Sequence, residues 1–461
     1  MENFWGFESW SGLNIIAILL ASLLVANILK RKIKFLRRSL IPTSVLGGGV
    51  LIIVAGIFKH ITGDVMFDTA FFGGNGTATL ELITYHTLAL GFIASTFKDS
   101  KHTFTKNRTT EIFNTGVTTV STYLLQGVVG MIISISALYI LGDFFAGAGI
   151  LLPFGYGQGT GQALNYGGIF ENDFGFIGGK SFGLTIAALG FLSASFGGVI
   201  HLNILRKRGV IKQTKANGEA ELNLEQIQKS TEIPMQESID KLTIQVALIA
   251  LAYTITYLIM MLLGSLFPGM KSVIFGFNFL LGVLSAMLVK VIISKLYKKK
   301  VITREYTNDF LMTCASNFCF DIMVVAGIAA IRLSILENYW GIILIMGIIG
   351  LIVTYFYNKL VANVLFKDYP EEQFLTMYGM LTGTASTGII LLREIDSEFQ
   401  SPAVDNMVYQ NFPAIVFGFP LMILATLAPV KPILTTVILF LFFIVMNIIL
   451  FRSIIFKKRS K

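Results

Sequence analysis

Stretches of about twenty apolar, uncharged residues recur along the whole chain, and they constrain its fold more than any other feature. A helix needs about 20 such residues to cross the hydrocarbon core of a bilayer. Only 14% of the 461 residues are charged, whereas an average soluble domain has about 25%. The sequence therefore predicts an all-α polytopic membrane protein.

Eleven of the apolar stretches have the length and composition of ordinary spanning helices. They cover residues 11–29, 40–58, 81–97, 113–141, 181–205, 242–266, 272–294, 308–331, 339–363, 405–428 and 432–451. Two further segments, 148–168 and 374–392, are interrupted by Gly, Thr and Ser. Because these two are too broken for ordinary spans, we interpret them as re-entrant hairpins.

Basic residues cluster on one side of the predicted topology. They follow the first, third, fifth, seventh and eleventh spans, whereas the intervening loops hold mostly single lysines. Cytoplasmic loops of membrane proteins are enriched in Lys and Arg. This pattern predicts a multi-pass protein with its N-terminus outside and its C-terminus in the cytoplasm. It also explains the net charge of +9 without a nucleic-acid partner.

The two glycine-rich segments resemble each other. "FGYGQGTGQ" begins at residue 154 and "YGMLTGTAS" at residue 378. Aligning Gly159 with Gly383 gives an offset of 224 residues, and the same offset superimposes the neighbouring predicted spans. Five spans and one hairpin in each half imply that the second half is inverted relative to the first. The predicted organisation is a first repeat (1–205), a polar cytoplasmic linker (206–240), an inverted repeat (241–428), and an eleventh helix with a basic tail (429–461).

Inverted repeats with broken segments at the bilayer midplane are typical of secondary transporters. The N-termini of half-helices favour a carboxylate, and free carbonyl and hydroxyl oxygens suit Na⁺. Close helix packing is the alternative explanation for small residues in a membrane. The candidate substrate-binding residues are Gly157, Gln158, Gly159, Thr160, Gly161, Gln162, Thr382, Gly383, Thr384, Ser386, Thr387 and Asn411.

Ionisable residues inside predicted spans are a second class of candidates, since charge in a membrane is costly. Asp321, together with Asn317 one helical turn before it, is a candidate ion-binding pair. Asp321 could instead form a structural pair with another helix. Arg393 could hold a substrate carboxylate, or it could pair with neighbouring acidic residues at the cytoplasmic rim.

Three motifs resemble the bacterial sodium/glutamate symporter family: "RRSLIPTSVLGGGVLIIVAGI" (37–57), "GYGQGTGQA" (155–163) and "SNFCFDIMVVAGIAAI" (316–331). The resemblance implies a carboxylate substrate, glutamate by default, with Na⁺ as the coupling ion and no other cofactor. It also implies a homodimer in a prokaryotic inner membrane that works by alternating access. Gln158 stands where the family usually has His, and the second hairpin lacks the family's Thr-Pro, which indicates a divergent member.

The leading prediction is therefore sodium-coupled symport of glutamate or a related carboxylate. An ion-coupled antiporter or exporter of another anionic solute is the alternative, with Asp321 as its ion carrier. A channel is disfavoured because polar residues are confined to the hairpins and a few other positions. We do not expect an enzyme, since "GYGQGTGQ" lacks the lysine of a phosphate-binding loop and no nucleophile–base pair is evident.

Overall fold

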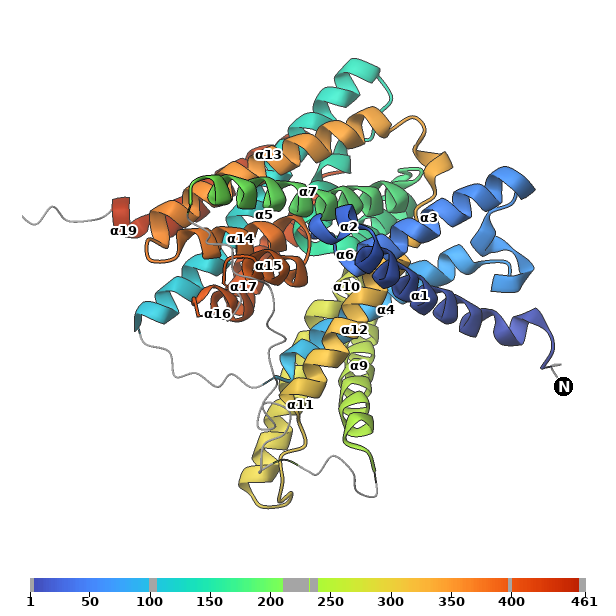
Figure 1. Cartoon of the computed structure of the whole chain (residues 1–461), viewed down its shortest axis with the longest axis horizontal. Coiled ribbons are helices and arrows are strands. Elements are labelled where there is room, and N and C mark those ends of the chain that lie inside the picture. Colours follow the sequence, from blue (N-terminus) through green and yellow to red (C-terminus); the bar gives the residue numbers. More distant parts are fainter. Residues whose placement is uncertain (1–3, 99–105, 210–231, 233–238, 397–399, 456–461) are drawn as a thin grey trace, which may run out of the picture. The chain divides into compact units, whose positions relative to one another are not determined.

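The computed structural model describes residues 4–98, 106–209, 232, 239–396 and 400–455. Apart from one isolated β-bridge between Glu232 and Glu305, the regular structure of these residues is helical (Figure 1). Nine helices in this part of the chain are long and apolar enough to cross a membrane, or ten if one bent pair counts as a single span. The prediction of an all-α polytopic membrane protein is confirmed at this level.

Each of the eleven predicted spans overlaps a helix, although 272–294 and 405–428 each run across a break between two helices. These helices are α1 (Phe7–Lys32), α3 (Thr43–Thr62), α4 (Gly76–Thr96), α5 (Lys106–Leu141), α7 (Gly179–Lys207), α9 (Lys241–Leu266), α11 (Asn278–Lys298), α12 (Asp309–Ala329), α13 (Trp340–Leu365), α17 (Asn411–Leu427) and α18 (Pro432–Leu450). The bent pair joins residues 403–409 to 413–427 at an angle of 52°. Helix α4 is absent from the membrane-crossing set because its threonines, Glu81 and His86 lower its hydropathy.

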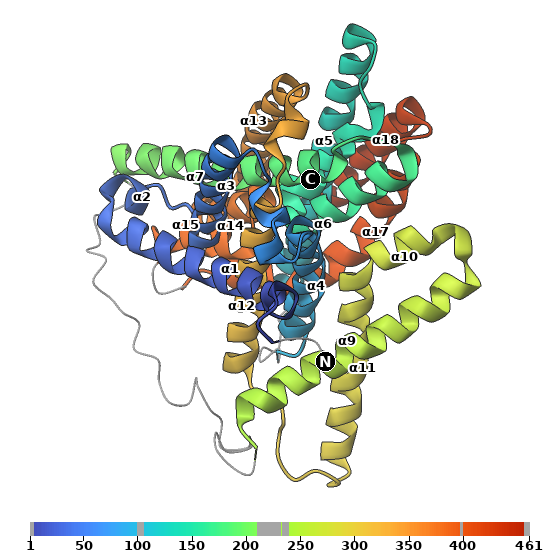
Figure 2. The same ribbon diagram turned by 90° about the vertical axis from the view of Figure 1, so that its right-hand side faces the viewer.

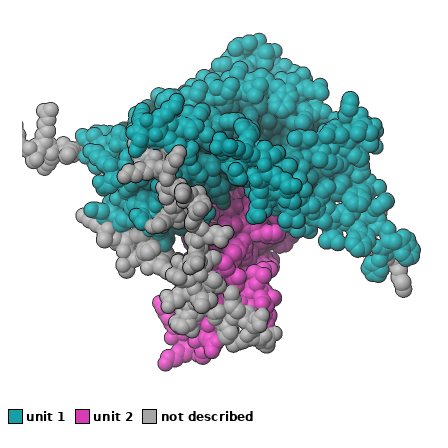
Figure 3. Space-filling view, in the orientation of Figure 1, with its two compact units in different colours: residues 1–80, 104–212, 325–461 teal, residues 81–103, 213–324 magenta. Residues whose placement is uncertain are grey.

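Helix contacts divide the chain into two compact units (Figure 3). Unit 1 contains residues 1–80, 104–212 and 325–461, and unit 2 contains residues 81–103 and 213–324. Each unit takes helices from both predicted repeats, so the units do not coincide with the halves 1–205 and 241–428. Most of the predicted linker 206–240 lies outside the described residues.

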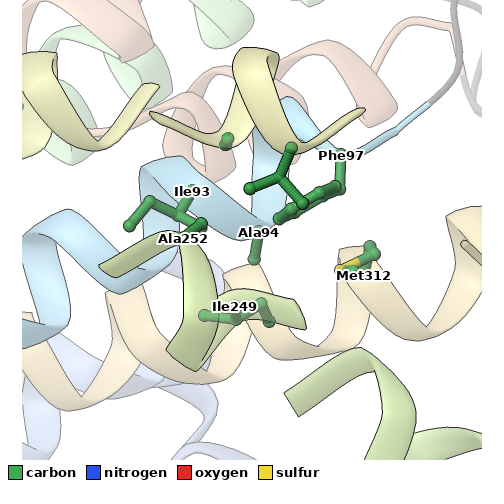
Figure 4. Close-up of a cluster of buried hydrophobic side chains, with 8 residues drawn as sticks. Ile93, Ala94, Phe97, Ile249, Ala252 and Met312 are labelled. Carbon is green, nitrogen blue, oxygen red and sulfur yellow. The ribbon is translucent and has the colours of Figure 1, made fainter. Parts of the chain in front are cut away.

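Unit 2 has its own apolar core (Figure 4). Ile93 and Phe97 of α4 pack with Ile249 of α9 and Met312 of α12, and all four side chains are buried. Lipid tails are as apolar as these side chains, so inside a membrane the core stabilises the unit through close van der Waals packing.

In unit 1, α5 and α13 run in opposite directions (Figure 1, Figure 2). Gln126 of α5 donates from Nε2 to Thr354 Oγ1 of α13 at 2.9 Å. Asn358, one turn further along α13, donates from Nδ2 to Thr122 Oγ1 at 3.4 Å. Because the residue number rises along α13 as it falls along α5, the two helices are antiparallel.

Helices α7 and α13 run in the same direction. If Gly347 carried a Cβ atom, that atom would lie only 2.9 Å from Leu189 Cδ1, so these two residues are in contact. Tyr355 OH lies 2.8 Å from His201 Nδ1. Residue numbers therefore rise together along the two helices. It follows that α7 is antiparallel to α5. Two broken segments of the chain pack against α5, α7 and α13.

Candidate functional site

The first broken segment is α6 (Leu151–Phe174), whose helical conformation is interrupted at Gly159. Its backbone there has φ 76° and ψ −168°, a conformation that glycine adopts and residues with a side chain avoid. The break falls at the glycine that the sequence repeat singles out.

The first half of α6 runs antiparallel to α5. A Cβ at Gly149, just before α6, would lie 2.1 Å from the Gly130 carbonyl oxygen of α5. Further on, Tyr123 OH of α5 donates to the carbonyl oxygen of Gly157 at 3.0 Å. The residue number rises along this segment from 149 to 157 as it falls along α5 from 130 to 123.

The second half of α6 runs antiparallel to α7 instead. A Cβ at Gly183 would lie 2.5 Å from the Ala163 carbonyl oxygen, and one at Gly167 would lie 2.4 Å from that of Gly179. Since α5 and α7 point in opposite directions, these contacts mean that the chain reverses near Gly159.

The second broken segment consists of α14 (Pro370–Thr382) and α15 (Ala385–Arg393), separated by Gly383 and Thr384. A Cβ at Gly388 would lie 2.4 Å from the Thr376 carbonyl oxygen, so the two helices pack backbone against backbone. Thr384 caps α15, and its Oγ1 accepts from the Thr387 backbone N–H at 3.4 Å. The chain therefore turns back on itself at Gly383, the glycine aligned with Gly159.

The two turns meet at the middle of α7. A Cβ at Gly190 would lie 2.6 Å from the Thr382 carbonyl oxygen, next to the second turn, and 3.1 Å from the ring of Tyr156, next to the first. Only a residue without a side chain leaves both segments this close. Gly190, which the sequence analysis did not single out, is thus their common contact.

The two segments reach Gly190 from opposite ends of α7. The second half of the first segment runs to the start of α7, where Gly167 contacts Gly179. The second begins beside its far end, where Glu371 Oε2 lies 2.7 Å from His201 Nε2. Further along α14, Tyr378 OH donates to the Ser193 carbonyl oxygen at 2.7 Å.

Helix α5 supplies a hydrogen-bond donor to each turn. Tyr123 OH bonds the Gly157 carbonyl, and Gln126 Nε2 bonds the Leu381 carbonyl at 3.0 Å. Residues three apart share one face of a helix, and the last carbonyls of a helix have no partner within it. Neither donor is among the residues predicted from the sequence. The sequence feature that could have indicated them is a row of polar residues at helical spacing along α5. These residues, Thr115, Thr119, Thr122 and Gln126, are all buried.

Most of the predicted substrate-binding residues gather at the two turns, with different exposure. Gln158 and Thr384 are partly exposed, and Ser386 and Asn411 are exposed. The remaining eight are buried: Gly157, Gly159, Thr160, Gly161, Gln162, Thr382, Gly383 and Thr387. Asn411 accepts from Gln410 Nε2 at 3.1 Å.

Gln162 is the most informative of these residues. Its side chain is 1% exposed, and neither its Nε2 nor its Oε1 has a hydrogen-bond partner in the described part of the chain. Gln126 Oε1 is also buried without a partner there. An unpaired buried polar group costs about 1–3 kcal/mol, so a polar ligand next to Gln162 would relieve that penalty.

The predicted ion-binding residues belong to a different compact unit from the two turns. Asn317 and Asp321 belong to unit 2 and are exposed on α12. Arg393 is exposed at the last residue of α15. Among the residues with described positions, no group of three or more His, Cys, Asp or Glu side chains is arranged to hold a metal ion.

No family model, curated protein or solved structure matches the chain. The resemblance to sodium/glutamate symporters therefore stays a prediction from the motifs, as do the homodimer and the inner-membrane location. The geometry of the two turns is what supports a function.

Proposed function

We propose that this chain is a secondary active transporter that couples Na⁺ to the uptake of glutamate or a related carboxylate by alternating access. The proposal combines three parts: an inverted repeat, two opposed re-entrant hairpins, and a polar binding position between them.

The inverted repeat is supported by the ends of the helices. Leu141 ends α5 and Leu365 ends α13, 224 residues later. Gly179 starts α7, and Ala403 starts α16 (Ala403–Tyr409), again 224 residues later. The same offset relates Gly159 to Gly383, and the matched helices α5 and α13 are antiparallel, as inversion requires.

The two hairpins are supported by the chain reversals at Gly159 and Gly383 and by their approach from opposite ends of α7. Irregular backbone is tolerated at membrane depth only where it is buried in protein or lines a cavity. Tyr123 and Gln126 satisfy one carbonyl at each turn, which is consistent with that requirement.

The chemistry of the turns suits a carboxylate and a small cation. New helices start after Gly159 and at Ala385, and their free N–H groups and dipoles favour an anion. The preceding half-helices end in carbonyl groups, which suit Na⁺, as in other transporters with broken helices. The single observation that carries the proposal is the buried amide of Gln162, three residues after the break at Gly159, which has no hydrogen-bond partner in the described part of the chain.

Uptake by purified protein in liposomes tests the proposal. With an inward Na⁺ gradient, we expect the vesicles to accumulate labelled glutamate, and we expect K⁺ in place of Na⁺ to abolish accumulation. Gln162→Leu should remove uptake, whereas Gly49→Ala should retain it, because a Cβ at Gly49 meets no atom within 4 Å.

The same assay separates the competing functions. Accumulation that is indifferent to Na⁺ contradicts the symporter. Uptake that requires an anion trapped inside the vesicles would identify an exchanger instead. If glutamate is not taken up, Na⁺-dependent uptake of another dicarboxylate would keep the transport class and change the substrate.

A further inference from the structure

A cavity of about 550 Å³ lies in unit 1, where three separate segments of the chain come together. They are the short helix α2 (Lys34–Arg38) with the residues after it, the last two turns of α7, and Glu394 after α15. None of the predicted substrate-binding residues lines this cavity. It is therefore a different site from the one between the two turns.

The cavity is lined by three arginines and one carboxylate: Arg37, Arg38, Arg206 and Glu394. Arg206 Nη2 lies 2.9 Å from Glu394 Oε2. Among the described residues, neither Arg37 nor Arg38 has an ion-pair partner, and both are exposed. The lining thus has an excess of positive charge, and guanidinium groups bind phosphate through paired N–H donors.

Apolar residues line the same cavity beside the arginines. They are Leu40, Val199 and Leu202. Leu40 has φ 57°, a left-handed conformation that is rare for a residue with a branched side chain and marks a backbone held by its surroundings. Its side chain packs against the cluster that contains Leu202 and Leu391.

The neighbouring surface is apolar as well. Phe35 of α2 is 71% exposed, and Phe196 and Ile200 of α7 are 55% and 57% exposed. Ile200 follows the cavity-lining Val199 directly, and Phe196 lies one turn before it. Helix α7 is one of the candidate membrane spans, so these side chains suit contact with acyl chains.

We propose that this cavity binds the phosphate group of an anionic phospholipid. Arg37 and Arg38 hold the phosphate, with Arg206 beside it, and the acyl chains lie along Val199 and the exposed face of α7. A soluble phosphate ester shares the same headgroup chemistry, but it would leave the apolar lining without a contact. Basic pockets at the ends of membrane helices are known sites for anionic lipid headgroups.

Thermal unfolding of the full-length protein in neutral detergent tests the site, with tryptophan fluorescence as the readout. We expect dioleoyl phosphatidylglycerol to raise Tm by at least about 2 °C. Dioleoyl phosphatidylcholine, which has no net charge, and glycerol phosphate, which has no acyl chain, should leave Tm unchanged at the same concentration. If glycerol phosphate raised Tm as much as the lipid does, the ligand of the cavity would be a soluble anion and not a lipid.

Three variants locate the effect. Arg37→Gln/Arg38→Gln should abolish the shift, and so should Val199→Trp, which fills the cavity without changing charge. Arg31→Gln/Lys32→Gln removes two exposed charges outside the cavity and should keep it. An equal loss in this control would mean general surface attraction, and a full shift in both cavity variants would overturn the proposal. Arg37 and Arg38 are exposed, so their double variant decides the question even if Val199→Trp does not fold.

Discussion

The turns at Gly159 and Gly383 contact the same helices but differ in exposure. Around the first turn, Thr160 and Gln162 are almost completely buried. At the equivalent positions of the second turn, 224 residues later, Thr384 is partly exposed and Ser386 is exposed. The difference teaches that two turns with similar sequences can lie in surroundings of very different exposure. We infer that the buried turn recognises the solute and that the exposed turn belongs to the side from which it enters or leaves.

The two turns also use different local chemistry. The first requires a positive φ at Gly159, which only glycine adopts readily. The second has φ −145° and ψ −108° at Gly383 and starts its next helix with a threonine cap. Some variants disrupt a contact that both turns make, and others change residues that differ between the two turns.

The largest effect is expected from Gly190→Ala, because it acts on both turns at once. The new Cβ would lie 2.6 Å from the Thr382 carbonyl oxygen and 3.1 Å from Tyr156, so the segments must move apart. Overpacking of this kind costs about 1–3 kcal/mol. We expect transport to be lost and Tm to fall, as measured by liposome uptake and thermal unfolding.

Gly49→Ala is the matched control for Gly190→Ala, because its Cβ has no neighbour within 4 Å. It should leave both measurements unchanged. Wild-type uptake by Gly190→Ala would show that transport does not need the contact of the two turns at Gly190.

The second effect separates the buried turn from the exposed one. Gln162→Leu removes a buried amide that has no partner in the described part of the chain. We expect the ligand-free protein to become more stable by about 1–3 kcal/mol while substrate binding is lost. Ser386→Ala, at the equivalent exposed position, should change stability by less than about 0.5 kcal/mol.

Chemical unfolding without substrate, together with isothermal titration with glutamate, distinguishes these outcomes. A destabilised Gln162→Leu protein would mean that the amide already has a structural partner. Equal effects of Gln162→Leu and Ser386→Ala would remove the functional distinction between the turns.

A third pair of variants compares the two donors on α5. Tyr123→Phe leaves the Gly157 carbonyl without the bond it accepts from Tyr123 OH, and we expect a loss of about 1 kcal/mol. Gln126→Leu removes the bond to the Leu381 carbonyl but also removes the unpaired Oε1. These two effects oppose each other, so Gln126→Leu should cost less than Tyr123→Phe. The reverse order in urea unfolding would contradict this account of the donors.

The sequence predicts the elements of this fold well because their signals are local. Long apolar runs place all eleven spans on helices, and the shared motif places both breaks at the correct glycines. Close packing, the alternative explanation for small residues, applies to Gly197 and Gly198 of α7, where Cβ atoms would lie 2.1 Å from Tyr378 OH and 2.4 Å from Leu391.

The site is predicted less completely because its contacts join distant parts of the chain. Tyr123 and Gly157 are 34 residues apart, and Gln126 and Leu381 are 255 apart. Nothing in the sequence near Gly190 distinguishes it from other glycines of α7. Conversely, a charge within an apolar run singled out Asp321, but only the packing of α12 decides whether that side chain faces a ligand.

The smallest effect is expected at the helix starts that follow the two turns. Thr384 caps α15 through a bond of 3.4 Å, so Thr384→Ala should cost about 0.5 kcal/mol, the low end for a cap. Thr160, at the equivalent position, is fully buried and packs against Gly327. Thr160→Ala leaves a cavity beside Gly327, which costs about 1 kcal/mol, so it should be the more destabilising. Hydrogen exchange of α6 and α15 measures both, and a larger effect at Thr384 would mean that the exposed turn, not the buried one, is the more tightly held.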